Sequence, residues 1–196
     1  MRYLFLALLL LAACSAPQQA PVAENSTVVP QINTTTSTFL EDAALEPEGI
    51  ITYVMESNHP EEVQSAIVKI YRKGTTVRKD IKEDKGETRM LDNEACYDIG
   101  GDWACETRTM QTLRFEDLQQ TILAHPSDYT LTPKGTRSLK KILASCTDIT
   151  ATDLDATYCV SQQGYVVYAS LKEGEYTSVY QATKIEDIGE DALAIP

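Results

Sequence analysis

Five cysteines are the residues of this 196-residue chain with the clearest chemical potential. Cys96 and Cys105 flank the sequence YDIGGDWA, and Cys146 and Cys159 flank TDITATDLDATY. An even number of cysteines in an exported domain is typical of disulfides, although four cysteines allow three pairings. The two local pairings place each pair on facing strands of a hairpin, where Cα atoms lie about 4.5–5.5 Å apart. We therefore expect Cys96–Cys105 and Cys146–Cys159, each stabilising the fold by roughly 2–3 kcal/mol.

Metal ligation and catalysis have weaker support. Zinc ligands come as C-x₂₋₄-C pairs, which the wider spacing of these cysteines does not match. Both histidines, His59 and His125, directly precede a proline, where we expect a solvated side chain. Asp148, Asp153 and Asp155 offer three carboxylates to Ca²⁺, but the spacing and glycine of an EF-hand are absent. The sequence also contains no G-x-S-x-G or H-E-x-x-H motif, so we expect no metal, no cofactor and no enzyme activity.

The fifth cysteine, Cys14, ends an apolar run that begins at Tyr3, directly after the positively charged Arg2. The run is too short for a bilayer span, which needs about 20 residues, and has the length of the apolar part of a secretory signal. Its last residues, LAAC, resemble the lipobox of prokaryotic lipoproteins. The resemblance implies that residues 1–13 are a lipoprotein signal peptide and that Cys14 carries diacylglycerol. The alternative is a plain signal peptide with a chance cysteine.

The charge balance limits the partners. Lys and Arg total 17 and Asp and Glu total 29, which gives a net charge of −12. Such an acidic chain is unsuited to nucleic acid or to electrostatic docking on anionic lipid, so we expect it to reach the membrane through lipid on Cys14. We also expect a monomer. Ser15 stands where lipoproteins kept at the inner membrane of enterobacteria-like systems carry Asp. We therefore expect an extracytoplasmic protein on the outer membrane, or on the outer face of a single membrane.

The segment 14–49 differs in composition from the rest of the chain. It is rich in Pro, Ser, Thr, Gln and Asn and has no apolar period, so it cannot bury enough surface to offset its ordering entropy. We expect a disordered tether here, with at most a helical turn at residues 39–45. Asn25 and Asn33 begin glycosylation sequons, which are common by chance.

Residues 50–196 have the pattern of an antiparallel meander with one helix. Short β-prone runs are separated by turn residues every 10 to 14 positions; the runs are IITYVMES, SAIVKIYR, TTVRKDIKE, ETRMLDNEACYD, WACETRT, ATYCVS, YVVYASLK and EYTSVYQATKIED. In TLRFEDLQQTILAH the apolar residues recur at helical spacing, and Pro126 follows as a stop signal. The basic stretches KGTTVRKD and RSLKK are expected to be edge-strand charges that prevent aggregation.

This domain resembles the exported half-barrel lipoproteins of the LolA/LppX-like type. The residues that carry the likeness are YRKG at 71–74, WAC at 103–105, Cys146, YC at 158–159, Gly164, YVVY at 165–168, AT at 182–183 and Pro196. The resemblance implies a strongly curved antiparallel sheet packed around one or two helices, an α+β fold. In this family the concave face and the helix enclose an apolar cavity that takes acyl chains. The chain differs from the soluble carriers of the family in having its own anchor and few aromatic residues.

The resemblance also affects the interpretation of residues 136–146. Leu139, Ile142, Leu143 and Cys146 are spaced as in a helix, whereas the likeness implies a strand that carries Cys146. Both readings remain open for residues 136–146, and we favour a strand over residues 143–149.

Alternation identifies candidate ligand contacts, because every second side chain of a strand lies on one face. The candidates are Tyr53, Met55, Val68, Ile70 and Val167. Two functions follow: a lipoprotein that binds a hydrophobic or lipid ligand in the half-barrel, or an envelope structural or interaction lipoprotein whose core is closed and ligand-free. In the second case these side chains are ordinary core.

A Cys14→Ala substitution tests the anchor. Two acyl chains hold a protein on a membrane where one is marginal, so the variant should move from the membrane fraction to the soluble fraction. Fractionation and intact mass measure the change. Wild-type protein with an unmodified Cys14 would contradict the lipoprotein assignment.

Overall fold

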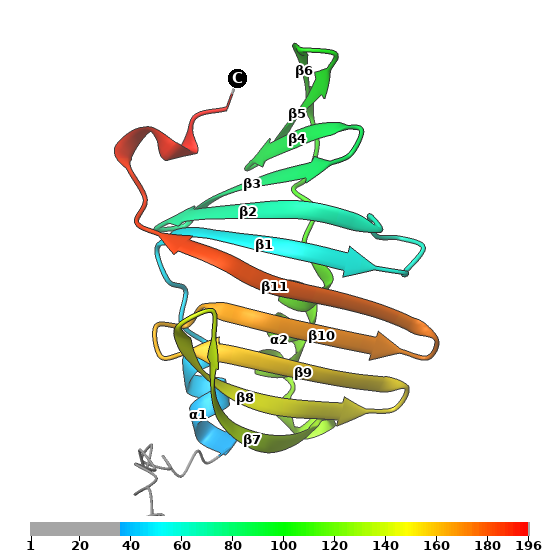
Figure 1. Ribbon diagram of the computed structural model, residues 1–196, viewed down its shortest axis with the longest axis vertical. Coiled ribbons are helices and arrows are strands. Elements are labelled where there is room, and N and C mark those ends of the chain that lie inside the picture. Colours follow the sequence, from blue (N-terminus) through cyan, green and yellow to red (C-terminus); the bar gives the residue numbers. More distant parts are fainter. Residues whose placement is uncertain (1–35, 196) are drawn as a thin grey trace, which may run out of the picture. The chain divides into compact units, whose positions relative to one another are not determined.

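Eleven antiparallel strands form one sheet in the computed structural model, which describes residues 36–195 (Figure 1). The elements in chain order are α1 Thr36–Ala43, β1 Gly49–Ser57, β2 Ser65–Lys73, β3 Thr76–Glu83, β4 Gly86–Leu91, β5 Glu94–Ile99, β6 Asp102–Thr107, α2 Arg114–Ala124, η1 Pro126–Asp128, β7 Thr130–Leu139, β8 Ile142–Ala151, β9 Leu154–Ser161, β10 Val166–Glu173, β11 Tyr176–Glu186 and η2 Glu190–Leu193.

The sheet is curved and unclosed. Its strand order is β6-β5-β4-β3-β2-β1-β11-β10-β9-β8-β7, so the first and last strands pair in the middle and β6 and β7 form the two edges. The helix α2 comes between the edge strands in sequence and lies behind the sheet in the view of Figure 1. This arrangement confirms the predicted half-barrel of strands packed on helices.

Side-chain alternation gives the sheet an apolar inner face, which is the face that carries Ile51, Tyr53 and Met55 of β1. The same face continues into β2 with Val68 and Ile70, which lie opposite Tyr53 and Ile51. The other face of β2 is more exposed, and Ile67 there is 45% accessible. The core therefore lies between the inner face and the helices.

Both local disulfides expected from the sequence are present. Cys96 of β5 faces Cys105 of β6, and Cys146 of β8 faces Cys159 of β9, with Cα atoms 4.0 Å apart in each pair. Each bond therefore links two neighbouring strands of one hairpin, and the two bonds lie in opposite halves of the sheet.

The ordered domain begins earlier than the predicted boundary at residue 50. Phe39 of α1 is 2% exposed, and its ring packs edge-on against Tyr158 at a centroid distance of 6.1 Å. The carbonyl oxygen of Ala43 accepts a 2.6 Å hydrogen bond from Gln119 of α2. The prediction of a disordered tether is therefore wrong for residues 36–49, because long-range contacts order a segment of weak local pattern. Residues 14–35 lie outside the described part of the chain.

Two strand boundaries also differ from the sequence pattern. The stretch 136–146 is not a helix: β7 and β8 meet at a turn where Lys140 and Lys141 have φ values of 48° and 72°. The strand favoured for residues 143–149 is confirmed as part of β8. The run ETRMLDNEACYD divides into β4 and β5 at Asp92, whose φ is 50°.

Three charged side chains of β3, those of Arg78, Lys79 and Asp80, are buried, which corrects their assignment to an edge. This strand lies between β2 and β4, and Arg78 and Asp80 on its outer face are each 7% exposed. The guanidinium of Arg78 donates to both carboxylate oxygens of Asp80 at 2.8 and 2.7 Å. It also donates to the carbonyls of Ala192 and Ala194 and stacks on Tyr71. Of the two basic stretches, only RSLKK lies in an edge hairpin.

Breaking this pair should be costly. Arg78→Met leaves the Asp80 carboxylate buried without its partner, so we expect a loss of about 3–5 kcal/mol in the free energy of unfolding. Replacing Asp80 by Leu as well should cost less than the two single changes together, by about 0.5–3 kcal/mol. Urea unfolding of the unaltered protein, the two single variants and the double variant measures this difference. Strictly additive effects would contradict the pairing.

Candidate functional site

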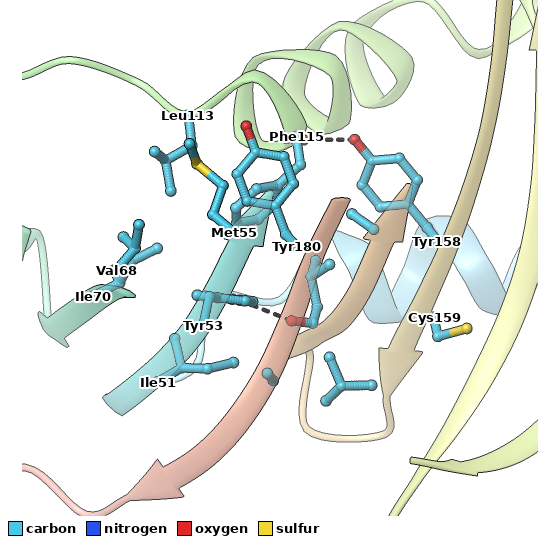
Figure 2. Close-up of a cluster of buried hydrophobic side chains, with 14 of the residues drawn as sticks. Ile51, Tyr53, Met55, Val68, Ile70, Leu113, Phe115, Tyr158, Cys159 and Tyr180 are labelled. Atoms are coloured by element: carbon cyan, nitrogen blue, oxygen red, sulfur yellow. Dashed lines mark hydrogen bonds between the residues drawn. The ribbon is translucent and has the colours of Figure 1, made fainter. Parts of the chain in front are cut away.

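An aromatic cluster joins α2 to the inner face of the sheet (Figure 2). The ring of Phe115 in α2 lies 5.3 Å from that of Tyr53 in β1 and 4.8 Å from that of Tyr180 in β11. Such tilted aromatic pairs contribute roughly 0.5–1.5 kcal/mol beyond the burial of their area. Phe115 therefore fixes the middle of the interior, with Met55 and Leu113 beside it in Figure 2.

The hydroxyl groups of two buried tyrosines, Tyr53 and Tyr158, donate to backbone carbonyls. Tyr158 donates to the carbonyl of Phe115 at 2.7 Å, and Tyr53 donates to that of Val166 at 2.8 Å (Figure 2). A buried hydroxyl without a partner is costly, so these bonds allow large aromatic side chains inside the fold. They also tie α2 to β9 and β1 to β10.

A buried ion pair holds the first turn of α2. Lys79 of β3 lies on the inner face opposite Ile70, and its ammonium is 2.5 Å from the carboxylate of Glu116. Glu116 also accepts the Leu113 N–H at 2.9 Å, and Lys79 donates to the carbonyl of Gln111 at 3.2 Å. An acidic residue in the first turn is favoured by the helix dipole. Both charges are therefore satisfied inside the protein.

A second carboxylate closes the other end of the interior. Glu62, in the loop between β1 and β2, accepts hydrogen bonds from Ser57 at 2.7 Å and from Ser178 and Tyr180. The three hydroxyls come from strands that pair in the centre of the sheet. Sequence patterns gave no signal for Glu62, because two of its partners, Ser178 and Tyr180, are far away in the chain.

Two cavities reach the interior from opposite sides of Phe115 and Leu113. The connector cavity, about 140 Å³, is bounded by the connector Ala44–Glu48 and the side of α2; its lining includes Ile51, Tyr53, Ile70, Arg72, Phe115 and Leu123. The loop cavity, about 230 Å³, lies beneath the β1–β2 loop; its lining includes Met55, Glu62, Val68, Ile81, Leu113 and Arg114. Each is smaller than the roughly 300 Å³ at which most small-molecule sites begin.

All five predicted ligand contacts are buried, and four of them line one of these two cavities. Tyr53 and Ile70 line the connector cavity, and Met55 and Val68 line the loop cavity. Val167 is buried but lines neither of these two cavities. Whether any of them contacts a ligand stays a prediction, and Cys14 lies outside the described residues.

Two other groups considered from the sequence, Asp148 and His59, have structural partners. Burial acts to raise the pKa of Asp148, but hydrogen bonds from the Lys134 ammonium at 2.7 Å and the Thr157 hydroxyl at 2.9 Å, together with nearby positive charge, lower it. The ring of His59 packs against Tyr176. Within residues 36–195, the one cluster with metal-ligand geometry is Glu94, Cys96 and Cys105, whose sulfurs form the disulfide.

Comparison with solved structures finds the same fold at low sequence identity. Lipoprotein LppX of Mycobacterium tuberculosis matches with a TM-score of 0.53 and 12% identity over 79% of this chain and 96% of LppX. LprF of Mycobacterium bovis matches with a TM-score of 0.56 and 11% identity over 82% of this chain and 96% of LprF. MucB matches with a TM-score of 0.54 and 16% identity over 82% of this chain but only 62% of MucB. A complex of MucA and MucB from Pseudomonas aeruginosa also matches. The chain therefore has the LolA/LppX-like fold and spans less than two thirds of MucB.

No protein-family model and no curated protein sequence matches the chain. Among the helices of residues 36–195, none has the length and apolar character needed to cross a membrane.

The buried tyrosines predict a loss of stability at alkaline pH. Burial raises the pKa of Tyr53 and Tyr158 well above 10, and burial with the bond to Glu62 raises that of Tyr180. An unfolded chain ionises these phenols near pH 10 and the folded protein does not. Stability should therefore be fully present below pH 10 and fall as the pH rises above it.

Urea midpoints between pH 8 and 11.5, together with tyrosinate absorbance, measure this loss. Tyr53→Phe removes one of the phenols and should make the loss less steep. Ionisation of all tyrosines near pH 10 in the folded protein would contradict the buried cluster.

Proposed function

We propose that this protein is a lipid-anchored, extracytoplasmic binding protein that takes the apolar part of a lipid-like ligand between its sheet and α2. One observation carries the proposal: an apolar inner face lies under α2 and is reached by a cavity on either side of the Phe115 cluster. The ligand would enter by shifting the connector Ala44–Glu48 or the loop that carries Glu62, because the cavities hold only part of an acyl chain.

The anchor in this proposal is Cys14, with diacylglycerol on its thiol. The lipobox-like end of the signal and the count of cysteines support it: the four other cysteines are paired in disulfides. The LppX match, which is a lipoprotein by name, has the same fold. Residues 15–35 would join the anchor to α1.

The polar groups of the interior support binding in place of catalysis. The hydroxyls of Tyr53 and Tyr158 donate to carbonyls, and Lys79 and Glu116 neutralise each other. In the described part of the chain, no buried side-chain nitrogen or oxygen lacks a hydrogen-bond partner. These groups thus hold the fold.

A second candidate is an interaction protein whose core stays free of ligand. The Phe115 ring fills the middle of the interior, and each cavity is smaller than a typical ligand site. MucB, which has this fold, is found in complex with MucA. In this case the outer surface and the sheet edges would contact a partner protein.

Matched substitutions on the two faces of β2 separate the candidates. Ile70→Phe places a larger side chain at the connector cavity, whereas Ile67→Phe makes the same change on the exposed face. The protein for this experiment is residues 15–196, exported and purified without detergent, which contains every described element. Native mass spectrometry detects co-purified lipid, and a fluorescent fatty acid measures affinity.

A lipid-binding protein should carry lipid or bind the probe, lose about tenfold in affinity with Ile70→Phe, and keep its affinity with Ile67→Phe. Thermal unfolding of both variants checks that they are folded. A clean apo mass without probe binding would reject the lipid-binding function and leave the interaction protein.

A further inference from the structure

A single cation stands at the end of an apolar row on the inner face of β2. Ala66, Val68 and Ile70 of that row are buried, and Arg72 follows at the end of the strand, opposite Gly49. Arg72 lines the connector cavity together with Ile51, Tyr53 and Ile70, whose positions Figure 2 shows. The lining of the cavity thus combines apolar side chains of β1 and β2 with one guanidinium.

The present partner of Arg72 is easily replaced. Its guanidinium lies 3.1 Å from the carboxylate of Glu46, whose side chain is 72% exposed. Exposed ion pairs of this kind contribute little to stability, because water and salt compete with them. The other nearby carboxylates are engaged: Glu48 accepts the Gly74 N–H at 2.8 Å, and Glu116 is bound to Lys79.

The size of the connector cavity limits the ligand to one chain. Its volume of about 140 Å³ holds only part of one acyl chain, so a second chain beside the first would need a still larger shift of the wall. Its outer wall is the connector Ala44–Glu48, which Tyr165 holds through a hydrogen bond to the Glu48 carbonyl. Glu46 belongs to this wall, so releasing Glu46 from Arg72 also loosens the wall in front of the cavity.

The loop cavity is more acidic than the connector cavity, whose lining holds the cation Arg72 and the carboxylates of Glu46 and Glu116. Glu61, Glu62 and Asp117 contribute carboxylates to its lining, and its cation, Arg114, is paired with Glu173. An anionic head group would be repelled there. The distribution of charge therefore distinguishes the two cavities.

We infer that the connector cavity binds a long-chain carboxylate of the fatty-acid class, with its tail along Ile51, Ile70 and Phe115 and its carboxylate on Arg72 in place of Glu46. This inference rests on the proposed lipid-binding function and adds the class of ligand and the residue that selects it. A guanidinium donates two parallel hydrogen bonds to a carboxylate, which a neutral alcohol cannot accept in the same way.

The test compares palmitate with hexadecanol, which has the same chain length and no charge, on residues 15–196. The unaltered protein should bind palmitate at least tenfold more tightly. Arg72→Gln should reduce the preference to within about twofold and leave hexadecanol binding unchanged. Arg89→Gln, which removes an equal charge from the outer face beside Trp103, should keep the full preference.

Glu46→Gln gives a readout of opposite sign. Removing the competing carboxylate should strengthen palmitate binding about two- to fivefold, whereas a purely structural role of the Arg72–Glu46 pair would weaken binding in both variants. Equal binding of palmitate and hexadecanol, or a preference that survives Arg72→Gln, would overturn the inference and leave lipid binding intact. Binding of neither probe would overturn both.

Discussion

The packing of Phe115 against Tyr53 and Tyr180 is the contact on which the rest of the structure depends. An unclosed sheet exposes its whole inner face unless another element covers it, and α2 is a helix of 11 residues. A helix of that length is only marginally stable by itself. Its position therefore comes from the aromatic contact, the Tyr158 hydrogen bond and the Lys79–Glu116 pair, which act at three points around the same turn.

The strand β3 shows how charge is accommodated on both sides of the sheet. Lys79 points to the interior and pairs with Glu116, while Arg78 and Asp80 on the outer face pair with each other. Removing two charges from water is expensive unless their partners and remaining hydrogen bonds are well placed. The Arg78 guanidinium also donates hydrogen bonds to the backbone carbonyls of Ala192 and Ala194. The segment after β11 is thus part of the fold.

Local patterns predicted the parts of the structure that depend on neighbours in sequence. The hairpins, the α2 segment and both disulfides follow from turn residues, apolar periods and cysteine spacing. The errors occurred where distant contacts decide: α1 is ordered by Phe39 on Tyr158, and β3 keeps its charges through partners in α2 and the C-terminal segment. The interior was predicted in part, because alternation identified Tyr53 and Ile70, but Tyr180, Glu62 and Lys79 meet it only in three dimensions.

The pairing of β1 with β11 has a consequence for the order of folding. The strands β2–β6 and β7–β10 each form from adjacent hairpins, and each group holds one disulfide. Such local contacts form quickly, whereas contacts between distant segments must first overcome the entropy of closing a long loop. Ile50 meets Glu186 across nearly the whole domain. The two halves can therefore fold and form their disulfides separately, whereas the β1–β11 pairing that joins them requires β11.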